Sequence, residues 1–137
     1  MTWVRGMSDY YLADDNCIAR LITEYKKHNS IIIAYDFDDT VYDFHKKGRQ
    51  YSDVITLLQR AKTAGCYLIV WTGEPDTKLV SEYLNKNNIP FDIINENPPF
   101  MIDKNPRKVY ANLYLDDRAG LSSACNQLHS MLTAVNL

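Results

Sequence analysis

The chain has 137 residues, 46% of them hydrophobic, with 17 acidic and 15 basic side chains and a net charge of −2. This length is that of one ordinary domain able to bury its own core, so we expect a single domain over residues 1–137. The near-neutral charge excludes the overall basic field that draws proteins to nucleic acids or anionic membranes, and no apolar run is long enough for a membrane span.

The first half of the chain predicts two helices that alternate with two strands. Apolar residues at helical spacing predict a helix over residues 15–29. The β-branched run that begins at Ile31, "IIIAYD", is typical of a central strand covered on both faces. Ser52 can cap a helix that Gly65 stops, and "CYLIVWT", residues 66–72, predicts the second strand.

The second half continues the alternation. Pro75 opens a predicted helix that ends before Pro90, and "FDIIN", residues 91–95, is a short third strand. "ANLYLDD", residues 111–117, is the fourth strand, and a closing helix runs through Leu132. Alternating strands and helices predict an α/β fold, in which a parallel sheet forms the middle of a Rossmann-like three-layer α/β/α arrangement.

Acidic and hydroxyl side chains follow three of the predicted strands. Asp36 and Asp38 come after the first strand, Thr72 after the second, and Asp116 and Asp117 after the fourth. Parallel strands end at one edge of the sheet, where ligands bind in such folds. Carboxylates gathered there would raise each other's pKa values unless a hard cation lay among them, and Mg²⁺ suits oxygen ligands and phosphate substrates.

These strand ends resemble a known family. "IIIAYDFDDT", "LIVWT" and "NLYLDD" match, in order, three signatures of the haloacid dehalogenase superfamily of aspartate-nucleophile phosphatases. The remaining signature is only a lysine before the last strand, for which Lys104 and Lys108 both qualify; we prefer Lys108, because it lies on the approach to that strand. The resemblance extends from about Ile31 to the closing helix and implies strand order 4-1-2-3, with strand one central.

The resemblance also implies a mechanism. Asp36 would attack phosphorus to form an aspartyl-phosphate, while Asp38 protonates the leaving oxygen and then activates water. Mg²⁺ would be the cofactor. Its ligands would be Asp36, the backbone carbonyl of Asp38, and Asp116 with Asp117 in support, which leaves open which of the last two binds directly. The residues implied for binding the substrate phosphate are Thr72, Gly73 and Lys108.

Substrate choice is the least determined property. Residues 41–51 allow only a short flap hairpin that turns at "KKG", and no cap domain fits elsewhere. By resemblance the protein is a capless phosphatase, whose site is open to large substrates or closed by a neighbouring subunit of a homo-oligomer. A small phosphorylated metabolite is favoured over a nucleic-acid end or a phosphoprotein, although the flap residues Lys46, Lys47 and Arg49 could bind a polyanion.

Other readings of the acidic run are a calcium loop, a phospho-receiver module and an inactive family member. A calcium loop fails, because Val41 and Lys47 stand where it needs Gly and Glu. A receiver carries its phosphorylated Asp after the third strand, where this chain has Asn95 and Glu96. A phosphatase-like binding or signalling module without turnover therefore remains the alternative to an enzyme.

The start of the chain and its cysteines bear on the compartment. "MTWVRGMSDYY" lacks the apolar core of a signal peptide. Cys17, Cys66 and Cys125 lie far apart and among apolar neighbours, as small buried hydrophobic residues do. Both features favour a cytoplasmic protein.

Overall fold

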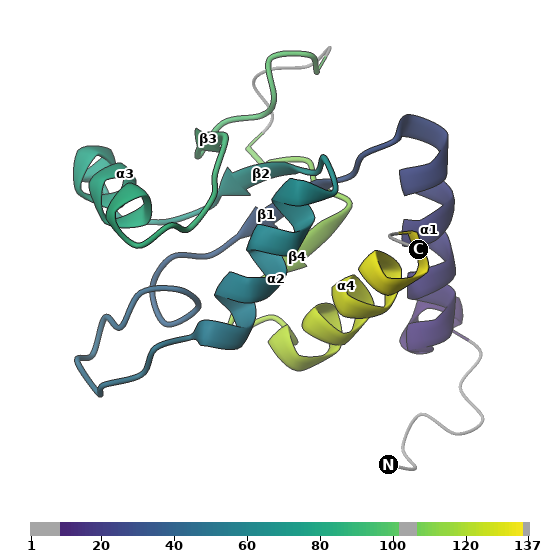
Figure 1. Cartoon of the computed structure of the whole chain (residues 1–137), viewed down its shortest axis with the longest axis horizontal. Coiled ribbons are helices and arrows are strands. Elements are labelled where there is room, and N and C mark those ends of the chain that lie inside the picture. The colour runs from purple at the N-terminus through teal and green to yellow at the C-terminus, as the bar shows by residue number, and fades with distance from the viewer. Residues whose placement is uncertain (1–8, 102–106, 136–137) are drawn as a thin grey trace.

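The computed structural model describes residues 9–101 and 107–135 and has an α/β fold (Figure 1). The helices are a 3-10 turn, η1 (Tyr10–Leu12), and the α-helices α1 (Asp14–His28), α2 (Ser52–Thr63), α3 (Thr77–Lys86) and α4 (Leu121–Val135). The strands are β1 (Ile32–Tyr35), β2 (Tyr67–Val70), β3 (Ile93–Ile94) and β4 (Leu113–Leu115). No helix within these ranges is long and apolar enough to cross a membrane.

All four strands pair in parallel, in the order β3-β2-β1-β4. Read from the other edge, this is the order 4-1-2-3 that the resemblance implied. Tyr35 aligns with Val70 of β2 and with Leu115 of β4, so these three neighbouring strands end level with one another. All four residues of β1 are buried, which confirms that it is the central strand.

The ends of several elements differ from the prediction by a few residues. Ser52 is the first residue of α2 rather than its cap, because Tyr51 occupies the cap position in the left-handed conformation, with φ 54°. α3 begins at Thr77, where the Asp76 carboxylate accepts a hydrogen bond from the Leu79 N–H at 3.0 Å. Gly65, with φ 87°, ends α2 as expected.

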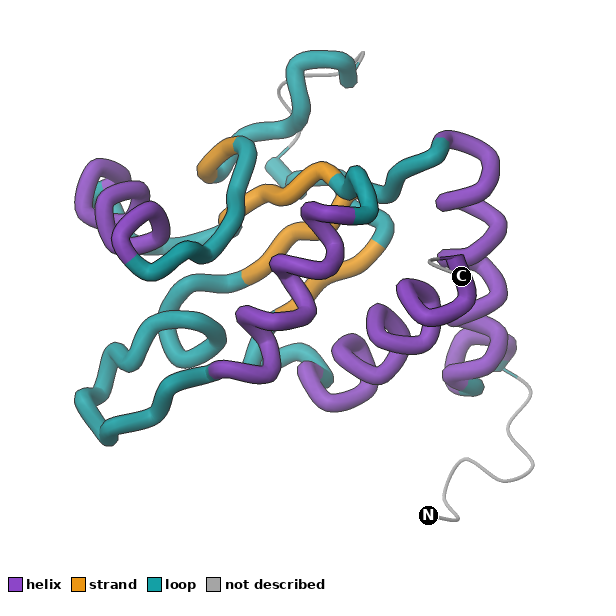
Figure 2. Tube along the Cα trace, in the orientation of Figure 1, coloured by secondary structure: helices purple, strands orange, loops and turns teal. Residues whose placement is uncertain are grey.

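The helices cover one face of the sheet, so the predicted three-layer arrangement is wrong for the described residues. The core residues of all four α-helices share one apolar cluster with alternate strand residues such as Ile33 and Leu68. The other face carries a smaller cluster around Ile32, Ala34 and Ile69, which packs against Val109 and contains no residue of an α-helix. Figure 2 shows α2 crossing in front of the strands.

The direction of the connections explains this asymmetry. The crossovers β1-α2-β2 and β2-α3-β3 both step the same way across the sheet, so right-handed connections place both helices on one face. The connection from β3 to β4 steps back past β1 and must cross the opposite face. Within its described residues that connection is a loop, so it places no helix on that face.

Candidate metal and phosphate site

Three carboxylates gather where β1 and β4 end. Asp36 directly follows β1, and Asp116 and Asp117 directly follow β4. The Asp36 N–H donates to the Leu115 carbonyl at 2.9 Å, which holds the two strand ends together. One oxygen from each carboxylate lies within 4.8 Å of the other two. We call Asp36, Asp116 and Asp117 the acidic site.

Thr40 connects Asp36 after β1 with Asp117 after β4. Its position in the D-x-D-x-T pattern gives only a weak indication of this role. Its side chain is fully buried. Its hydroxyl accepts a hydrogen bond from the Asp117 N–H at 3.1 Å and lies 3.3 Å from Asp36 Oδ2 and 3.2 Å from Asp117 Oδ1. Because a hydroxyl has only one proton, it can donate to one of these carboxylates at a time.

We expect Thr40→Val to destabilise the protein by about 0.5–1.5 kcal/mol, because the change keeps the shape but removes the half-buried hydrogen bond from the Asp117 N–H. Thr40→Ser, which retains the hydroxyl, is the matched control and should recover most of this loss. Urea unfolding of the two variants measures the difference. Equal stability of the Val and Ser variants would show that the hydroxyl contributes nothing.

The acidic site holds more negative charge than it can stabilise by itself. Burial raises the pKa of Asp36 to about 7, with further contributions from a hydrogen bond to Asp117 and from the charges of Asp116 and Asp117, while Thr40 lowers it. No lysine or arginine in residues 9–101 and 107–135 forms an ion pair with these three carboxylates. Three hard oxygen donors without a protein cation fit the requirements of Mg²⁺.

This crowding predicts a pH dependence of stability in the absence of divalent cations. The pKa of Asp36 is higher in the folded chain than the ordinary value of 3.8, so the folded state binds its proton more tightly than the unfolded state. The free energy of unfolding in EDTA should therefore fall as the pH rises from about 4 to about 7. Asp36→Asn, measured in parallel, should show a shallower fall; identical profiles would contradict the assigned pKa.

Asp38 and Asp39 are not members of the acidic site. Asp39, in the left-handed conformation with φ 59°, lies 2.8 Å from His45 Nδ1 and accepts a hydrogen bond from the Tyr51 hydroxyl at 3.3 Å. The side chain of Asp38 is half-buried and stays outside the three-carboxylate group. Burial raises the pKa of Asp38, followed by the charges of Glu74, Asp39 and Asp117. A raised pKa suits a general acid.

Thr72 follows β2, as predicted. Asn95 holds its backbone in place, a role that no sequence pattern indicated. The Thr72 N–H donates to Asn95 Oδ1 at 2.7 Å, and the Asn95 side-chain amide donates to the Thr72 carbonyl at 2.8 Å. The Thr72 hydroxyl accepts a hydrogen bond from the Glu74 N–H at 3.1 Å and keeps its own proton to donate. At Gly73 an added Cβ would meet no atom within 4 Å, so space does not require glycine there.

The two candidate lysines are placed differently. Lys104 lies outside the described residues. The Lys108 ammonium lies 5.3 Å from the centre of the Tyr114 ring, on the face of the sheet that the helices leave uncovered. Lys108 lines one cavity together with Asp116 but forms no ion pair with an aspartate of the described chain.

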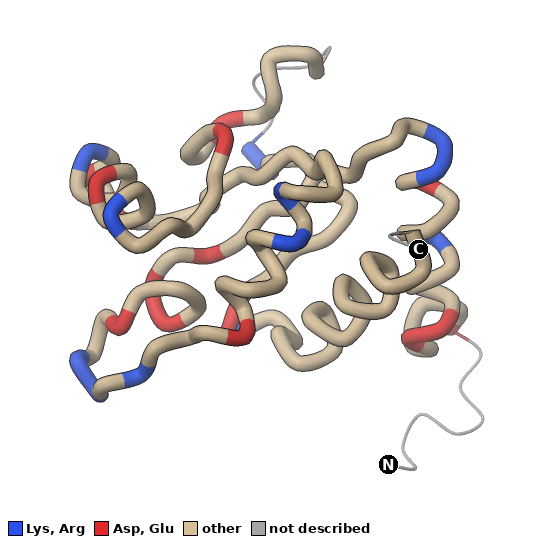
Figure 3. The backbone as a smooth tube through the Cα atoms, viewed as in Figure 1, with Lys and Arg blue, Asp and Glu red and all other residues tan. Residues whose placement is uncertain are grey.

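Residues 41–51 form a loop rather than the predicted hairpin. The only strand-like pairing near them is an isolated bridge between Asp38 and Tyr42. Instead, the Asp43 carboxylate accepts hydrogen bonds from the Lys47 N–H at 3.0 Å and the Gly48 N–H at 2.7 Å, which closes the turn. In Figure 3 the backbone positions of the basic residues of this loop, in blue, lie at its outer tip. A turn closed by a side chain leaves too few backbone groups for a two-stranded ladder.

Comparisons with known proteins support the fold alone. No protein-family model matches the chain, and no curated protein matches it. A solved structure described as a conserved protein coded by a locus of Bacteroides thetaiotaomicron is similar to it, with 25% identity and a TM-score of 0.54. The similarity covers 65% of this chain and 77% of the other. This description names no activity, so function has to be argued from the site.

Proposed function

We propose that this protein is a Mg²⁺-dependent phosphomonoesterase of the haloacid dehalogenase type that acts through an aspartyl-phosphate. The observation that carries the proposal is the acidic site: three carboxylates from the ends of two neighbouring parallel strands, within 4.8 Å of one another and paired with no lysine or arginine of the described residues. Asp38, which follows two residues after Asp36, supplies a second acid with a raised pKa.

In the proposed reaction, a carboxylate oxygen of Asp36 forms a bond to phosphorus as the bond from phosphorus to the leaving oxygen breaks. Asp38 gives its proton to that oxygen, so the product leaves as an alcohol. Water then attacks the phosphorus of the aspartyl-phosphate and gives a proton to Asp38, which releases inorganic phosphate and restores both side chains. Mg²⁺ bound by the acidic site would supply positive charge against the phosphate oxygens.

Three further groups would orient the phosphate. The Thr72 hydroxyl oxygen accepts a hydrogen bond from the Glu74 N–H. Its proton is donated to no acceptor among the described residues and is available to a phosphate oxygen. Lys108 has a flexible four-carbon stem, and its present contact with the Tyr114 ring is a weak one that an anion can replace. Gly73 would contribute its backbone N–H beside an open space.

A substrate screen tests the proposal directly. Sugar phosphates, nucleotides, 3'-phosphorylated oligonucleotides, phosphopeptides and a generic aryl phosphate are assayed for release of inorganic phosphate with Mg²⁺. We expect turnover of the aryl phosphate and of at least one small metabolite. Absence of turnover on every class would favour a phosphatase-like binding or signalling module instead.

The loop over residues 41–51 remains our prediction for part of the substrate choice. Its basic residues Lys46, Lys47 and Arg49 are exposed, and none of them forms an ion pair with an acid of the described chain. Replacing all three by Ala should lower kcat/KM for polyanionic substrates several-fold more than for the aryl phosphate, because long-range attraction is lost. The matched control replaces Lys26 and Lys27, exposed at the end of α1. An unchanged substrate ranking would remove this loop from substrate selection.

A further inference from the structure

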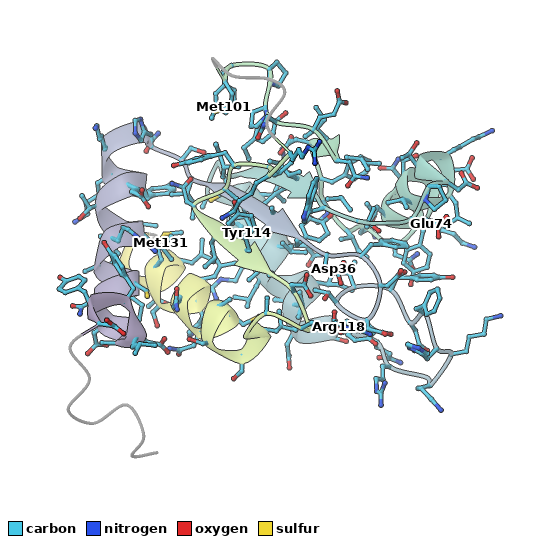
Figure 4. The ribbon with its side chains drawn as sticks, turned by 180° about the vertical axis from the view of Figure 1, so that it is seen from behind. Asp36, Glu74, Met101, Tyr114, Arg118 and Met131 are labelled. Carbon is cyan, nitrogen blue, oxygen red and sulfur yellow. The ribbon has the colours of Figure 1, made fainter. Side chains whose placement is uncertain are left out.

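The face of the sheet without helices is hollowed next to the acidic site. A cavity of about 700 Å³ begins at Asp116 and follows β4 past Tyr114 to Asn112. Arg20 and Glu24 of α1 form one wall, and Lys108 and Tyr110 form the other. Figure 4 shows the molecule from behind, so that this face points toward the reader, with Tyr114 on β4 and Asp36 near the end of the neighbouring strand. We call this hollow the rear cavity.

Strand register explains why Asp116 of the acidic site lines the rear cavity. Tyr35, Val70 and Leu115 are paired neighbours, so the residues that follow them, Asp36, Trp71 and Asp116, share the opposite face of the sheet. That face is the one without helices. Trp71 is therefore in the same row as two carboxylates of the acidic site, and 37% of its surface is exposed. An indole beside a phosphate site offers a flat apolar surface to the rest of a substrate.

Two half-buried hydrogen bonds hold residues that line the cavity. The buried Asn97 side chain accepts a hydrogen bond from the Tyr110 N–H at 2.8 Å, and the Tyr114 hydroxyl donates to the Val109 carbonyl at 2.6 Å. The first bond fixes the backbone at Tyr110 and the second fixes the ring of Tyr114, and a fixed aromatic ring binds a flat group at little entropic cost. The rear cavity is thus largely formed before any ligand enters.

Glu24 provides a polar group that the fold leaves unused. Its Oε1 atom is buried and has no hydrogen-bond partner among the described residues. A buried acceptor without a donor is costly, so a turn of the Glu24 side chain into the cavity, where a ligand could supply the donor, would relieve this cost. Glu24 lies in the wall of the rear cavity beside Asn112, at the far end from Asp116.

We propose that the rear cavity binds the base of a nucleoside monophosphate whose phosphate occupies the acidic site; this inference rests on the proposed function. Asp116 and Asn112 are four residues apart, which is about 13 Å along a strand and close to the length of such a nucleotide. Trp71 and Tyr114 present aromatic surface to a flat base. A carboxylate matches the two adjacent N–H donors of guanine, so guanine is the preferred base.

The test uses guanosine, which lacks the phosphate and so binds independently of Mg²⁺ and of the nucleophile. Isotope-labelled protein is titrated with guanosine and with ribose in EDTA while the amide and indole signals are recorded. We expect guanosine to bind at least about tenfold more tightly than ribose and to shift the Trp71 indole signal and the Tyr110 and Tyr114 amide signals. Equal affinities, or shifts confined to Phe100 and Met101 of the neighbouring hollow, would overturn the proposal.

Variants locate the binding. Trp71→Ala should lower the affinity for guanosine at least about fivefold, whereas Phe100→Ala, an exposed aromatic residue outside the rear cavity, is the matched control and should not. If Trp71→Ala does not fold, Glu24→Gln, which is nearly identical in shape, should likewise weaken guanosine binding by removing the carboxylate. Retained affinity in a folded Trp71→Ala or Glu24→Gln variant would contradict the assignment.

The two proposals can fail separately. With Mg²⁺, kcat/KM for guanosine monophosphate should exceed that for ribose 5-phosphate by at least about tenfold. Turnover of aryl phosphate without any preference for guanosine over ribose overturns the base site alone. Guanosine binding at Trp71 without turnover of any phosphate ester overturns the proposed enzyme, and the nucleotide substrate with it.

Discussion

Asp36→Asn should abolish phosphatase turnover, with a loss of at least about a thousandfold in kcat, because the amide cannot serve as the attacking oxygen anion. The same change should stabilise the metal-free protein at pH 8. It removes one negative charge from a site in which burial and the neighbouring carboxylates already raise the pKa of Asp36 to about 7, and Asn has nearly the same shape as Asp.

Activity and stability therefore move in opposite directions, which a merely structural aspartate would not produce. Initial rates on an aryl phosphate and thermal unfolding in EDTA give the two readouts. Asp15→Asn, an exposed acid in the first turn of α1, is the control and should leave turnover unchanged. Wild-type turnover by Asp36→Asn would exclude Asp36 as the nucleophile.

Chelation of divalent cations should have the second large effect. EDTA should reduce turnover to background, and added Mg²⁺ should restore it. Mg²⁺ should also raise the melting temperature more at pH 8 than at pH 5, because the acidic site carries its full negative charge only above the raised pKa of Asp36.

The variants Asp116→Asn and Asp117→Asn test which of these two aspartates binds Mg²⁺ directly. Isothermal titration with Mg²⁺ should show the larger loss of affinity for the residue that binds the ion directly. Asp76→Asn, at the start of α3 and outside the acidic site, serves as the control. Full activity in EDTA, or Mg²⁺ binding that neither variant weakens, would contradict a metal at this site.

Local patterns were sufficient to predict the strands and the α-helices to within a few residues at their ends. The buried run after Ser30 became the central strand because an apolar, β-branched segment can satisfy its backbone only by pairing on both sides. Parallel pairing then places Asp36, Thr72 and Asp116 at one edge, since parallel strands end on the same side. These positions follow from strand periodicity and chain order, which a sequence displays directly.

Contacts between distant segments decided the rest of the site. Thr40 lies 77 residues from Asp117, and Asn95 lies 23 residues from Thr72, so no local pattern indicates that their hydrogen bonds form. Asp39 is next to Asp38 in the chain, but a left-handed backbone turns it toward His45. The direction of the Asp39 side chain therefore depends on its φ angle, which the sequence does not display.

The uncovered face of the sheet is the clearest example of a feature that local sequence patterns do not predict. Alternation of strands and helices correctly predicts a parallel α/β sheet, but it does not tell which side each connection crosses. That side follows from handedness together with strand order, and the order exists only once β4 has paired beside β1. The sequence by itself thus determined the residues that meet at the strand ends. The tertiary structure decided that Asp36, Trp71 and Asp116 open onto a face without helices, because side chains alternate across a strand and only the folded sheet has a covered side.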